Sequence, residues 1–317
     1  MRILITGGFG FIGGRLAVYL ASAGHEIAIA TRNFNTPPKW LPEAKVVKIT
    51  WNDDKALELA CSGVDVIIHA AGINAQDCLA NPEAALAFNG LTTGRLVQAA
   101  IKTSVKKFIY LSTAHVYKSP LNGVITEETC PTNLHPYATS HIKGEQAVLS
   151  ANKYKEFQGI VLRISNAFGA PAFKEVNCWM LLVNDLCKQA VEKRKLFLQT
   201  NGQQQRDFIG LTEVCKTIEY FINNYIGSNQ AEIFNLGSGM SQSVISMAQL
   251  IQQQCYKVLG FKPELNCKEN KIDQQQPHLI YVSNKLKELG FIYQKKDETE
   301  EVDSLLKFCE IAFAGKQ

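Results

Sequence analysis

The stretch TGGFGFIGGRL, residues 6–16, decides the fold of this chain. It follows a β-branched run and opens a helical pattern, so its glycines stand at a turn from a strand to a helix. Gly8, Gly10 and Gly13 have the G-x-G-x-x-G spacing, which in this position is typical of a dinucleotide-binding turn. We expect Gly10 to let the backbone approach a pyrophosphate and Gly13 to let the helix pack closely on the strand.

Outward from this turn, short apolar strands alternate with helical segments as far as about residue 165. That alternation predicts parallel strands joined by crossover helices, and therefore an α/β fold with a doubly wound parallel sheet of the Rossmann type. The expected strands are 2–6, 26–31, 45–50, 64–71, 106–112 and 159–165. The expected helices are 11–24, 53–61, a long one through the eighties and nineties, and another that carries PYATSHIKGE (136–145).

Beyond residue 166 the pattern loosens into single helices and isolated strands. We expect a dinucleotide-binding domain at 1–165 and a smaller C-terminal α/β substrate-binding lobe at 166–317, with segments that cross back to the first domain. In this second part we expect a helix at 177–195, short strands at 196–199 and 206–210, and a final helix near 299–313.

Composition excludes several classes of protein. The net charge of +4 is small for 317 residues, and the basic residues form no stripe or tail, so we expect no nucleic-acid partner. There is no run of about 18 apolar residues, so we expect no membrane segment and a cytoplasmic protein. The nine cysteines form no C-x-x-C pair, which favours reduced, buried thiols and no metal site.

Glycines 7, 10 and 13 also give the spacing G-x-x-G-x-x-G, and further segments match one family along most of the chain. They are VDVIIHAAG (64–72), Asn89, YLSTAHVY (110–117), LRISNAFG (162–169), QRDFIGLTEV (205–214) and IFNLGSG (233–239). The chain resembles the extended short-chain dehydrogenases/reductases, in the branch called the NAD-dependent epimerase/dehydratase family. Most members of that branch act on nucleotide-activated sugars.

The resemblance implies a bound nicotinamide dinucleotide, NADP or NAD. The residues that it assigns to the cofactor lie in the glycine-rich turn, at the ends of strands two and four, and on the two long helices. They are Gly7, Gly10, Phe11, Ile12, Gly13, Thr31, Arg32, Ala70, Ala71, Asn89, Tyr137 and His141.

The end of the second strand bears on the choice between the two cofactors. A carboxylate there binds the 2'-hydroxyl of the adenosine ribose, whereas an arginine without an acid accommodates a 2'-phosphate. This chain has Thr31 followed by Arg32, which favours NADP. The alternative is that Arg32 is a solvated loop residue and that Thr31 and the backbone hold the ribose.

The resemblance implies that Tyr137 transfers the proton of the substrate hydroxyl and that Thr113 hydrogen-bonds the same oxygen. The family lysine that follows the tyrosine by four residues stabilises the phenolate and binds the nicotinamide ribose. Here that position holds His141, and Lys143 lies on another face of the helix. We therefore predict a working but slow enzyme.

His115, two residues after Thr113, is a further catalytic candidate. Several subfamilies place an acid or base at this position, and an imidazole could move a proton on a carbon beside a transient ketone. The alternative is a histidine that only lines the pocket. The Asp-Glu pair of the sugar dehydratases is replaced by Ala114 and His115, which disfavours dehydration.

Two residues after position 165 are expected to anchor the substrate. Asn166 lies in the N-x-F-G segment, and Arg206 matches the family arginine that contacts the diphosphate of a nucleotide sugar. A guanidinium fork suits phosphate. The alternative for Arg206 is a salt bridge with a nearby acid.

Together these residues predict an NAD(P)-dependent epimerase acting on a nucleotide-linked sugar through a keto intermediate, with a homodimer as the expected assembly. An NADP(H)-dependent keto-sugar reductase is the second hypothesis, because net reduction usually draws on NADPH. A catalytically impaired cofactor-binding protein is the third, and the replacement of lysine by His141 favours it.

Overall fold

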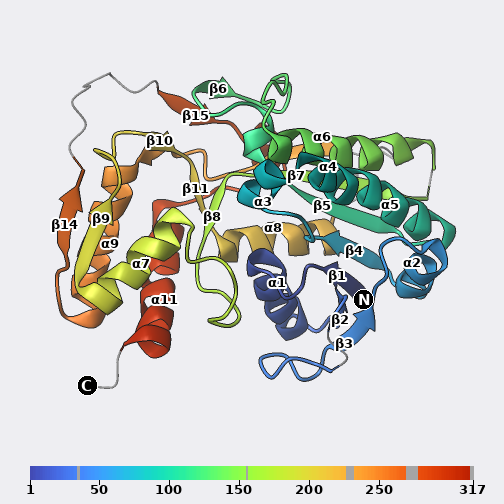
Figure 1. The fold of residues 1–317 in the computed structure, drawn as a ribbon, viewed down its shortest axis with the longest axis horizontal. Coiled ribbons are helices and arrows are strands. Elements are labelled where there is room, and N and C mark those ends of the chain that lie inside the picture. The colour runs from blue at the N-terminus through green and yellow to red at the C-terminus, as the bar shows by residue number, and fades with distance from the viewer. Residues whose placement is uncertain (34–35, 155, 226–231, 269–277, 315–317) are drawn as a thin grey trace. The chain divides into compact units, whose positions relative to one another are not determined.

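The computed structural model describes residues 1–33, 36–154, 156–225, 232–268 and 278–314 (Figure 1). The chain forms two compact units, each assembled from separate segments. The first unit comprises Met1–Ser119, Thr129–Ile164 and Cys215–Phe234, and the second comprises Pro120–Glu128, Ser165–Val214 and Asn235–Gln317. A stretch after residue 165 therefore returns to the first unit.

The first unit is built on a seven-stranded sheet of order β12-β7-β5-β4-β1-β2-β3. Its strands are β1 (Arg2–Thr6), β2 (Glu26–Thr31), β3 (Lys45–Lys48), β4 (Val66–His69), β5 (Lys107–Thr113), β7 (Gln158–Ile164) and β12 (Glu232–Leu236). The pairs from β3 across to β7 are all parallel. The prediction of a doubly wound parallel sheet is confirmed, and the strand order reverses between β1 and β4, where such sheets bind their ligands.

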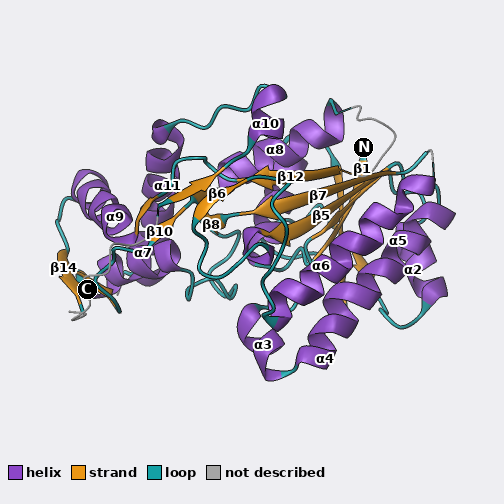
Figure 2. Ribbon diagram, turned by 90° about the horizontal axis from the view of Figure 1, so that it is seen from above, coloured by secondary structure: helices purple, strands orange, loops and turns teal. Residues whose placement is uncertain are grey.

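Helices cover both faces of this sheet. In chain order they are α1 (Phe11–Ser22), α2 (Asp54–Cys61), α3 (Ala75–Ala80), α4 (Pro82–Ala85), the π-helix η1 (Leu86–Thr92), α5 (Thr93–Lys102), the 3-10 turn η2 (Ala114–Val116), α6 (Pro136–Leu149), the 3-10 turn η3 (Ser150–Lys153) and α8 (Leu211–Asn223). Figure 2 shows α8 on one side of the sheet and α2, α5 and α6 on the other. On the α8 side, the Tyr19 hydroxyl of α1 donates to Glu219 at 2.9 Å.

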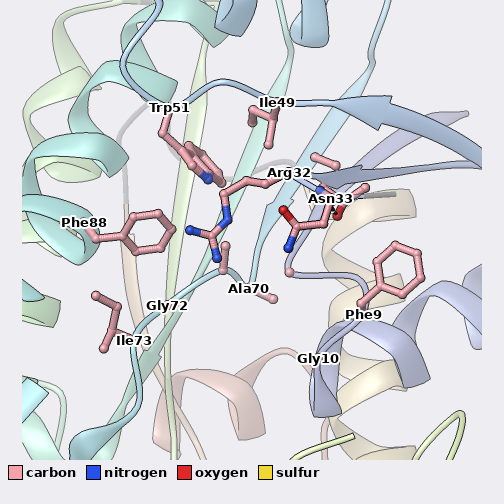
Figure 3. A pocket seen from close by; sticks show the side chains of 14 residues that line it. Phe9, Gly10, Arg32, Asn33, Ile49, Trp51, Ala70, Gly72, Ile73 and Phe88 are labelled. Atoms are coloured by element: carbon pink, nitrogen blue, oxygen red, sulfur yellow. Dashed lines mark hydrogen bonds between the residues drawn. The ribbon is translucent and has the colours of Figure 1, made fainter. Parts of the chain in front are cut away.

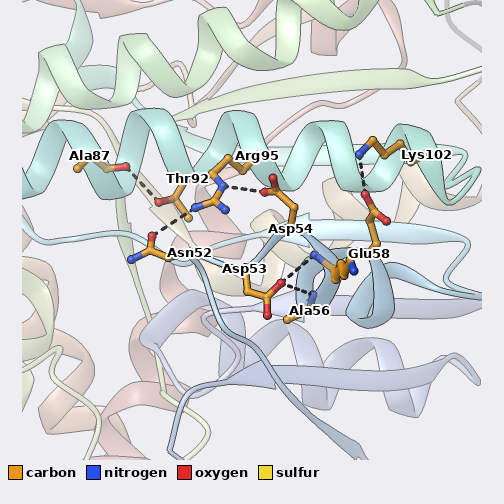
Figure 4. A network of polar contacts seen from close by, with 10 residues as sticks. Asn52, Asp53, Asp54, Ala56, Glu58, Ala87, Thr92, Arg95 and Lys102 are labelled. Carbon is orange, nitrogen blue, oxygen red and sulfur yellow. Dashed lines mark hydrogen bonds and ion pairs between the residues drawn. The ribbon is translucent and has the colours of Figure 1, made fainter.

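Apolar burial and a few polar ties hold these layers together. All four residues of β4 are buried, as expected for a central parallel strand covered on both faces. The Lys107 ammonium donates to three carbonyls at the end of α8, at 2.8 to 3.0 Å. Ion pairs join α2 to α5, with Arg95 2.8 Å from Asp54 and Lys102 2.7 Å from Glu58 (Figure 4).

The long helix expected through the eighties and nineties is interrupted. The structure divides it into α4, the π-helix η1 and α5, because η1 inserts a wider turn before Thr93. The Thr92 hydroxyl donates to the Ala87 carbonyl, five residues earlier, at 3.1 Å. Such π-turns are rare and are frequent at functional sites, and apolar periodicity alone does not reveal one.

The second unit consists of short two-stranded sheets and helices. Its strands are β6 (Gly123–Ile125), β8 (Asn166–Phe168), β9 (Lys195–Leu198), β10 (Gln205–Arg206), β11 (Phe208–Gly210), β13 (Gln242–Ser243), β14 (Glu264–Cys267) and β15 (Leu279–Tyr281), paired as β10-β13, β11-β8, β14-β9 and β15-β6. Its helices are α7 (Leu182–Lys193), α9 (Val244–Leu259), α10 (Asn284–Glu288) and α11 (Lys295–Phe313).

Two predicted helix starts in this unit are wrong. The helix expected from residue 177 begins at Leu182, because Leu181 has an extended backbone and its amide closes a turn on Cys178. The last helix begins at Lys295, before residue 299, because Gln294 and Asp297 form a capping box. Local hydrogen bonds, which apolar spacing does not encode, set both starts.

Two further predictions concern cysteines and membranes. Seven of the nine cysteines are buried free thiols, but Cys130 and Cys267 are exposed, so burial was predicted wrongly for these two. Among the described helices, none has the length and apolar character needed to cross a lipid bilayer.

Candidate active site

The glycine-rich turn after β1 is shaped by contacts that a side chain would block. Gly7 has φ +69°, and a Cβ there would lie 2.7 Å from the backbone of Ala70. The Gly10 amide donates to the Gly7 carbonyl at 2.8 Å. A Cβ on Gly13 would collide with that same carbonyl, so α1 packs closely on the backbone that directly follows β1.

The N-terminus of α1 lacks the capping found on other helices of this unit. Gly10 supplies no side-chain cap, and the first turn holds no acidic residue. By contrast, the Asp53 carboxylate accepts from two amides at the start of α2, at 3.0 and 3.2 Å. First-turn amides without a cap, together with the helix dipole, favour an anion such as phosphate.

A pocket of about 320 Å³ opens beside this turn (Figure 3). Its lining comes from the turn after β1, the end of β2, the loops after β2, β3 and β4, and the π-helix η1. The lining residues are Gly7, Phe9, Gly10, Ala30, Thr31, Arg32, Asn33, Ile49, Trp51, Ala70, Ala71, Gly72, Ile73 and Phe88. Six of the predicted cofactor residues are among them: Gly7, Gly10, Thr31, Arg32, Ala70 and Ala71.

Several lining residues were missed by the sequence reasoning. Trp51 and Phe88 meet edge to face, with ring centroids 5.3 Å apart, and form an apolar wall of the pocket. They come from positions 37 residues apart in the chain, on segments that the sequence pattern does not place together. An aromatic at each position was the only available signal.

Arg32 reaches into the pocket from the end of β2. Figure 3 shows its guanidinium surrounded by Trp51, Phe88 and Asn33. The Thr31 hydroxyl accepts from the Asn33 amide at 3.3 Å. Because the described lining contains no carboxylate, this end of the pocket carries one positive charge and no negative one.

Asn89, predicted to contact the cofactor, lies buried in the π-helix η1. Its side-chain oxygen accepts from the Ile73 amide at 2.8 Å, and its side-chain nitrogen donates to the Ser140 hydroxyl at 3.0 Å. Asn89 therefore fastens the loop that lines the pocket to helix α6. Ser140 was not singled out from the sequence.

Thr113 and Tyr137 come together in the first unit. Helix α6 begins with Pro136 at its first position, and the His135 ring accepts from the Tyr137 amide at 3.2 Å. Thr113 ends β5, where its hydroxyl oxygen accepts from the His115 amide at 3.2 Å. Burial raises the pKa of Tyr137 to about 12, and a hydrogen bond with the Thr113 side chain acts in the opposite direction.

His141 stands beside Tyr137, with ring centroids 4.5 Å apart and planes at 68°. Its Nδ1 lies 3.0 Å from the Tyr110 hydroxyl on β5. Burial lowers the pKa of His141 to about 4, so the ring is neutral at neutral pH. Lys143 is exposed, and its stem packs on Gly90, which agrees with its predicted place on another face.

Tyr110 was not among the predicted site residues. A tyrosine in the buried run KFIYLST needs a hydrogen-bond partner for its hydroxyl, and that requirement was the available signal. His115, by contrast, was predicted, and its side chain is exposed. Asn133 holds its backbone by donating to the His115 carbonyl at 2.7 Å.

Asn166 and Arg206 belong to the second unit. The Asn166 side chain donates to the Asp207 carbonyl at 2.8 Å. The Arg206 guanidinium donates to the Gln204 side-chain oxygen, from Nη2 at 2.9 Å and from Nε at 3.3 Å. No carboxylate in the described ranges lies within ion-pair distance of Arg206, so the predicted alternative of a salt bridge has no partner there.

The described residues contain no group of three or more histidines, cysteines or acids placed to hold a metal ion. Asn89, Thr113, His141 and the polar side chains that contact them include hydroxyls and an imidazole, which donate hydrogen bonds and can transfer protons.

Residues 3–237 match the family model described as the NAD dependent epimerase/dehydratase family. The chain belongs to this family. It is 26% identical over 286 residues to the UDP-glucose 4-epimerase of Bacillus subtilis (strain 168), covering 83% of this chain and 84% of that protein.

Solved structures of similar fold include two with different cofactors. The UDP-glucose 4-epimerase from Bifidobacterium longum, in complex with NAD+ and UDP, has a TM-score of 0.78 at 24% identity, covering 99% of this chain and 100% of that one. RMD from Pseudomonas aeruginosa, complexed with NADPH, has a TM-score of 0.76 at 20% identity, covering 98% and 99%. The family and the pocket together establish a nicotinamide cofactor for this chain, without a choice between NAD and NADP.

Proposed function

We propose that this family member is an epimerase that acts on a nucleotide-linked sugar through a transient ketone. The observation that carries the proposal is the pairing of Tyr137 with Thr113 at the end of β5, in the same unit as the dinucleotide pocket. The Bacillus subtilis relative bears the name of such an epimerase, which supports the same activity.

The pocket fits a dinucleotide on the geometry of its own residues. Glycines 7, 10 and 13 leave a cradle that side chains would fill, and the α1 amides of Phe11, Ile12 and Gly13 are free of a side-chain cap. When bound, the nicotinamide supplies the acceptor and donor of hydride. We propose that the pyrophosphate binds at this turn. Trp51 and Phe88 form the apolar wall of the part of the pocket that lies beyond the turn.

Tyr137 is the proposed acid and base. Its phenolate oxygen takes the proton of the sugar hydroxyl during oxidation, and the hydroxyl so formed returns that proton during reduction, while Thr113 donates a hydrogen bond to the same sugar oxygen. The Thr113 oxygen already accepts from the His115 amide, so its own proton is directed elsewhere. His141 holds the nicotinamide ribose through one hydrogen bond.

His115 is assigned a secondary role. Its side chain is exposed, so it is accessible to solvent protons, and an imidazole can remove a proton from a carbon next to a ketone. If it does so, solvent deuterium should enter that carbon during turnover, and His115→Ala should slow the exchange more than the oxidation. A parent enzyme that turns over without exchange would return His115 to lining the site.

Arg206 and Asn166 are the proposed substrate anchors in the second unit. Arg206 is a guanidinium held by a neutral amide, which leaves its charge available to a diphosphate. The complex of the Bifidobacterium longum structure with UDP supports a uridine nucleotide as the first ligand to test.

For the cofactor we propose NADP over NAD. The support is the arginine at the pocket end of β2 and the lack of a carboxylate in the described lining. This assignment also favours the second candidate function, an NADP(H)-dependent keto-sugar reductase. A protein that has lost turnover is the third candidate, favoured by the neutral His141 and disfavoured by the paired Tyr137 and Thr113.

We further propose a homodimer in the cytoplasm. Leu79 and Leu91, on α3 and η1, expose 62% and 58% of their surface, which supports a subunit contact in this region. Light scattering of the purified protein tests the assembly, and Leu91→Glu should shift a dimer toward monomer. A monomeric parent would contradict it.

One experiment separates the candidates. The purified protein is incubated with a panel of UDP- and dTDP-sugars, with NAD(H) and NADP(H) supplied in turn. Isomerised sugar without net change in cofactor absorbance supports an epimerase, and stoichiometric oxidation of NADPH with a keto-sugar supports a reductase. Binding of the dinucleotide without any product supports the impaired protein.

A further inference from the structure

Tyr110 and His141 form a buried hydrogen-bonded pair in the first unit. Tyr110 is 2% exposed and His141 7%, and the distance between the tyrosine oxygen and His141 Nδ1 is 3.0 Å. In the described part of the chain, neither side chain has another hydrogen-bond partner. The hydrogen bond between them therefore has to satisfy the hydroxyl proton as well as Nδ1.

That requirement fixes the direction of the bond. A neutral imidazole carries one proton, on either Nδ1 or Nε2. If Nδ1 carried it, Tyr110 would accept, and its own buried hydroxyl proton would have no acceptor. Leaving a buried donor unsatisfied is costly, so Tyr110 donates to a bare Nδ1 and the proton of the ring lies on Nε2.

Both groups are held in the neutral forms that this arrangement needs. Burial keeps the pKa of Tyr110 well above 10, so the hydroxyl retains its proton. Burial also lowers the pKa of His141, so the ring is neutral at neutral pH. The ring of His69 lies in the same buried region and is stacked on Tyr110, with ring centroids 5.6 Å apart.

The backbone around the pair is adapted to it. A Cβ on Gly144 would collide with the Tyr110 hydroxyl and would lie 2.7 Å from the Asn89 carbonyl, so only glycine admits the hydroxyl against α6. On the other side, His141 Cε1, the carbon between its two nitrogens, faces Gly72. A Cβ on Gly72 would lie 4.0 Å from it, and Gly72 lines the pocket.

We infer that Tyr110 is a positioning residue that holds His141 in the tautomer with the proton on Nε2, so that the ring presents a hydrogen-bond donor to the dinucleotide pocket. The family lysine offers a donor through its ammonium group. In this chain the neutral Nε2–H of His141 takes the place of that donor, and Tyr110 on β5 orients the ring. The inference about the pocket rests on the proposed function, whereas the tautomer itself does not.

The tautomer is tested by nitrogen NMR on protein labelled with ¹⁵N-histidine, with the His141 signals assigned by their loss in His141→Asn. In the parent protein we expect a proton on Nε2 and none on Nδ1. In Tyr110→Phe we expect a mixture of the two tautomers. A parent ring protonated on Nδ1, or a tautomer unchanged in Tyr110→Phe, overturns the inference. This measurement needs no substrate, so it stands apart from the proposed function.

Cofactor affinity provides the second test. Tyr110→Phe should weaken dinucleotide binding about fivefold, the worth of about one neutral hydrogen bond. Tyr281→Phe is the matched control, because it removes a buried hydroxyl that donates to Asn235 at the same 3.0 Å in the second unit. That control should lose similar thermal stability and keep its dinucleotide affinity.

A double-mutant cycle identifies the route of the effect. In a His141→Ala background, Tyr110→Phe should leave the remaining dinucleotide affinity unchanged, because the tyrosine acts through the ring. An equal loss in both backgrounds would show that Tyr110 acts on its surroundings generally and would overturn the positioning role. A parent protein that binds no dinucleotide would overturn the proposed function, while the NMR result would still decide the tautomer.

Discussion

The two units of the chain treat their polar residues differently. In the first unit, two hydrogen bonds beside the pocket join neutral side chains: Tyr110 with His141, and Asn89 with Ser140. In the second unit, Arg206 keeps a full charge whose described partner is the neutral Gln204. Hydrogen bonds between neutral groups fix geometry, whereas a charge without a counter-ion retains the capacity to bind an anion.

The polar residues of the two units are therefore proposed to serve different functions. In the first unit, hydrogen bonds between neutral groups position the proposed proton-transfer residues, and in the second unit the charge of Arg206 is proposed to bind a ligand. A substitution in one unit should change the function of that unit and leave the function of the other unchanged.

Removing the Tyr137 hydroxyl should have the largest effect. Tyr137→Phe should lower kcat by about 10²–10⁴-fold, the usual contribution of a general acid or base, with dinucleotide affinity unchanged. Tyr225→Phe is the control, because its hydroxyl donates to Glu232 at 2.8 Å elsewhere in the same unit. Steady-state kinetics on the sugar identified by the panel gives the measurement. Full activity in Tyr137→Phe would remove PYATSHIKGE from the active site.

Removing the charge of Arg206 in the second unit should have the next largest effect. Arg206→Ala should weaken binding of a nucleoside diphosphate sugar by about 1.5 to 3 kcal/mol, or about 10- to 100-fold, since a charged group makes the phosphate contact. Dinucleotide affinity should stay the same. Calorimetry with each ligand measures both.

Lys195→Ala serves as the control for Arg206, because it removes the same charge from an exposed site of the same unit, beside Glu264. If both variants weaken sugar binding equally, Arg206 acts only through net charge. If the parent protein binds no nucleoside diphosphate, the substrate assignment fails.

The pH dependence of the oxidation rate tests whether a charge stabilises the phenolate of Tyr137 in the first unit. The raised pKa of Tyr137, about 12, favours the protonated phenol, so the phenolate base is scarce at neutral pH and increases about tenfold per pH unit. The oxidation rate should therefore climb into the alkaline range. His141→Lys should move this rise to lower pH, because an ammonium stabilises phenolate. A rate that is already flat at neutral pH would show that another group stabilises the phenolate of Tyr137.

Arg32 is the exception within the first unit and should give the smallest effect. If it binds a 2'-phosphate, the parent should prefer NADPH to NADH by at least about tenfold, and Arg32→Ala should remove most of that preference. Arg95→Ala, which loses a charge paired with Asp54 in the same unit, should keep it. Fluorescence titration of both reduced cofactors measures the ratio, and equal affinities in the parent protein would refute the assignment.

Much of the first unit could be predicted from the sequence. The turn at Gly7 to Gly13 and the alternation of strands and helices are local signals, so the parallel sheet followed from them. Six lining residues of the pocket followed from these signals together with the family resemblance. The family itself was identified from short motifs spread along most of the chain, and the family model confirms it.

The partners of the site residues could not be predicted in the same way. Tyr110 and His141 are 31 residues apart, and Trp51 and Phe88 are 37 apart, so their contacts depend on the packing of α6 on β5 and of η1 beside the pocket. Only the folded chain brings such pairs together. The assigned roles of the sixteen predicted site residues remain predictions, although the structure gives the surroundings of each.

The π-helix η1 also constrains how this region can change in length. A residue in a helix turns the chain by about 100°, so deleting one residue between Asn89 and Thr93 would rotate Asn89 away from Ile73 and Ser140. An insertion would do the same in the opposite sense. The number of residues in η1 therefore sets the register of Asn89, which links the pocket loop to the helix that bears Tyr137.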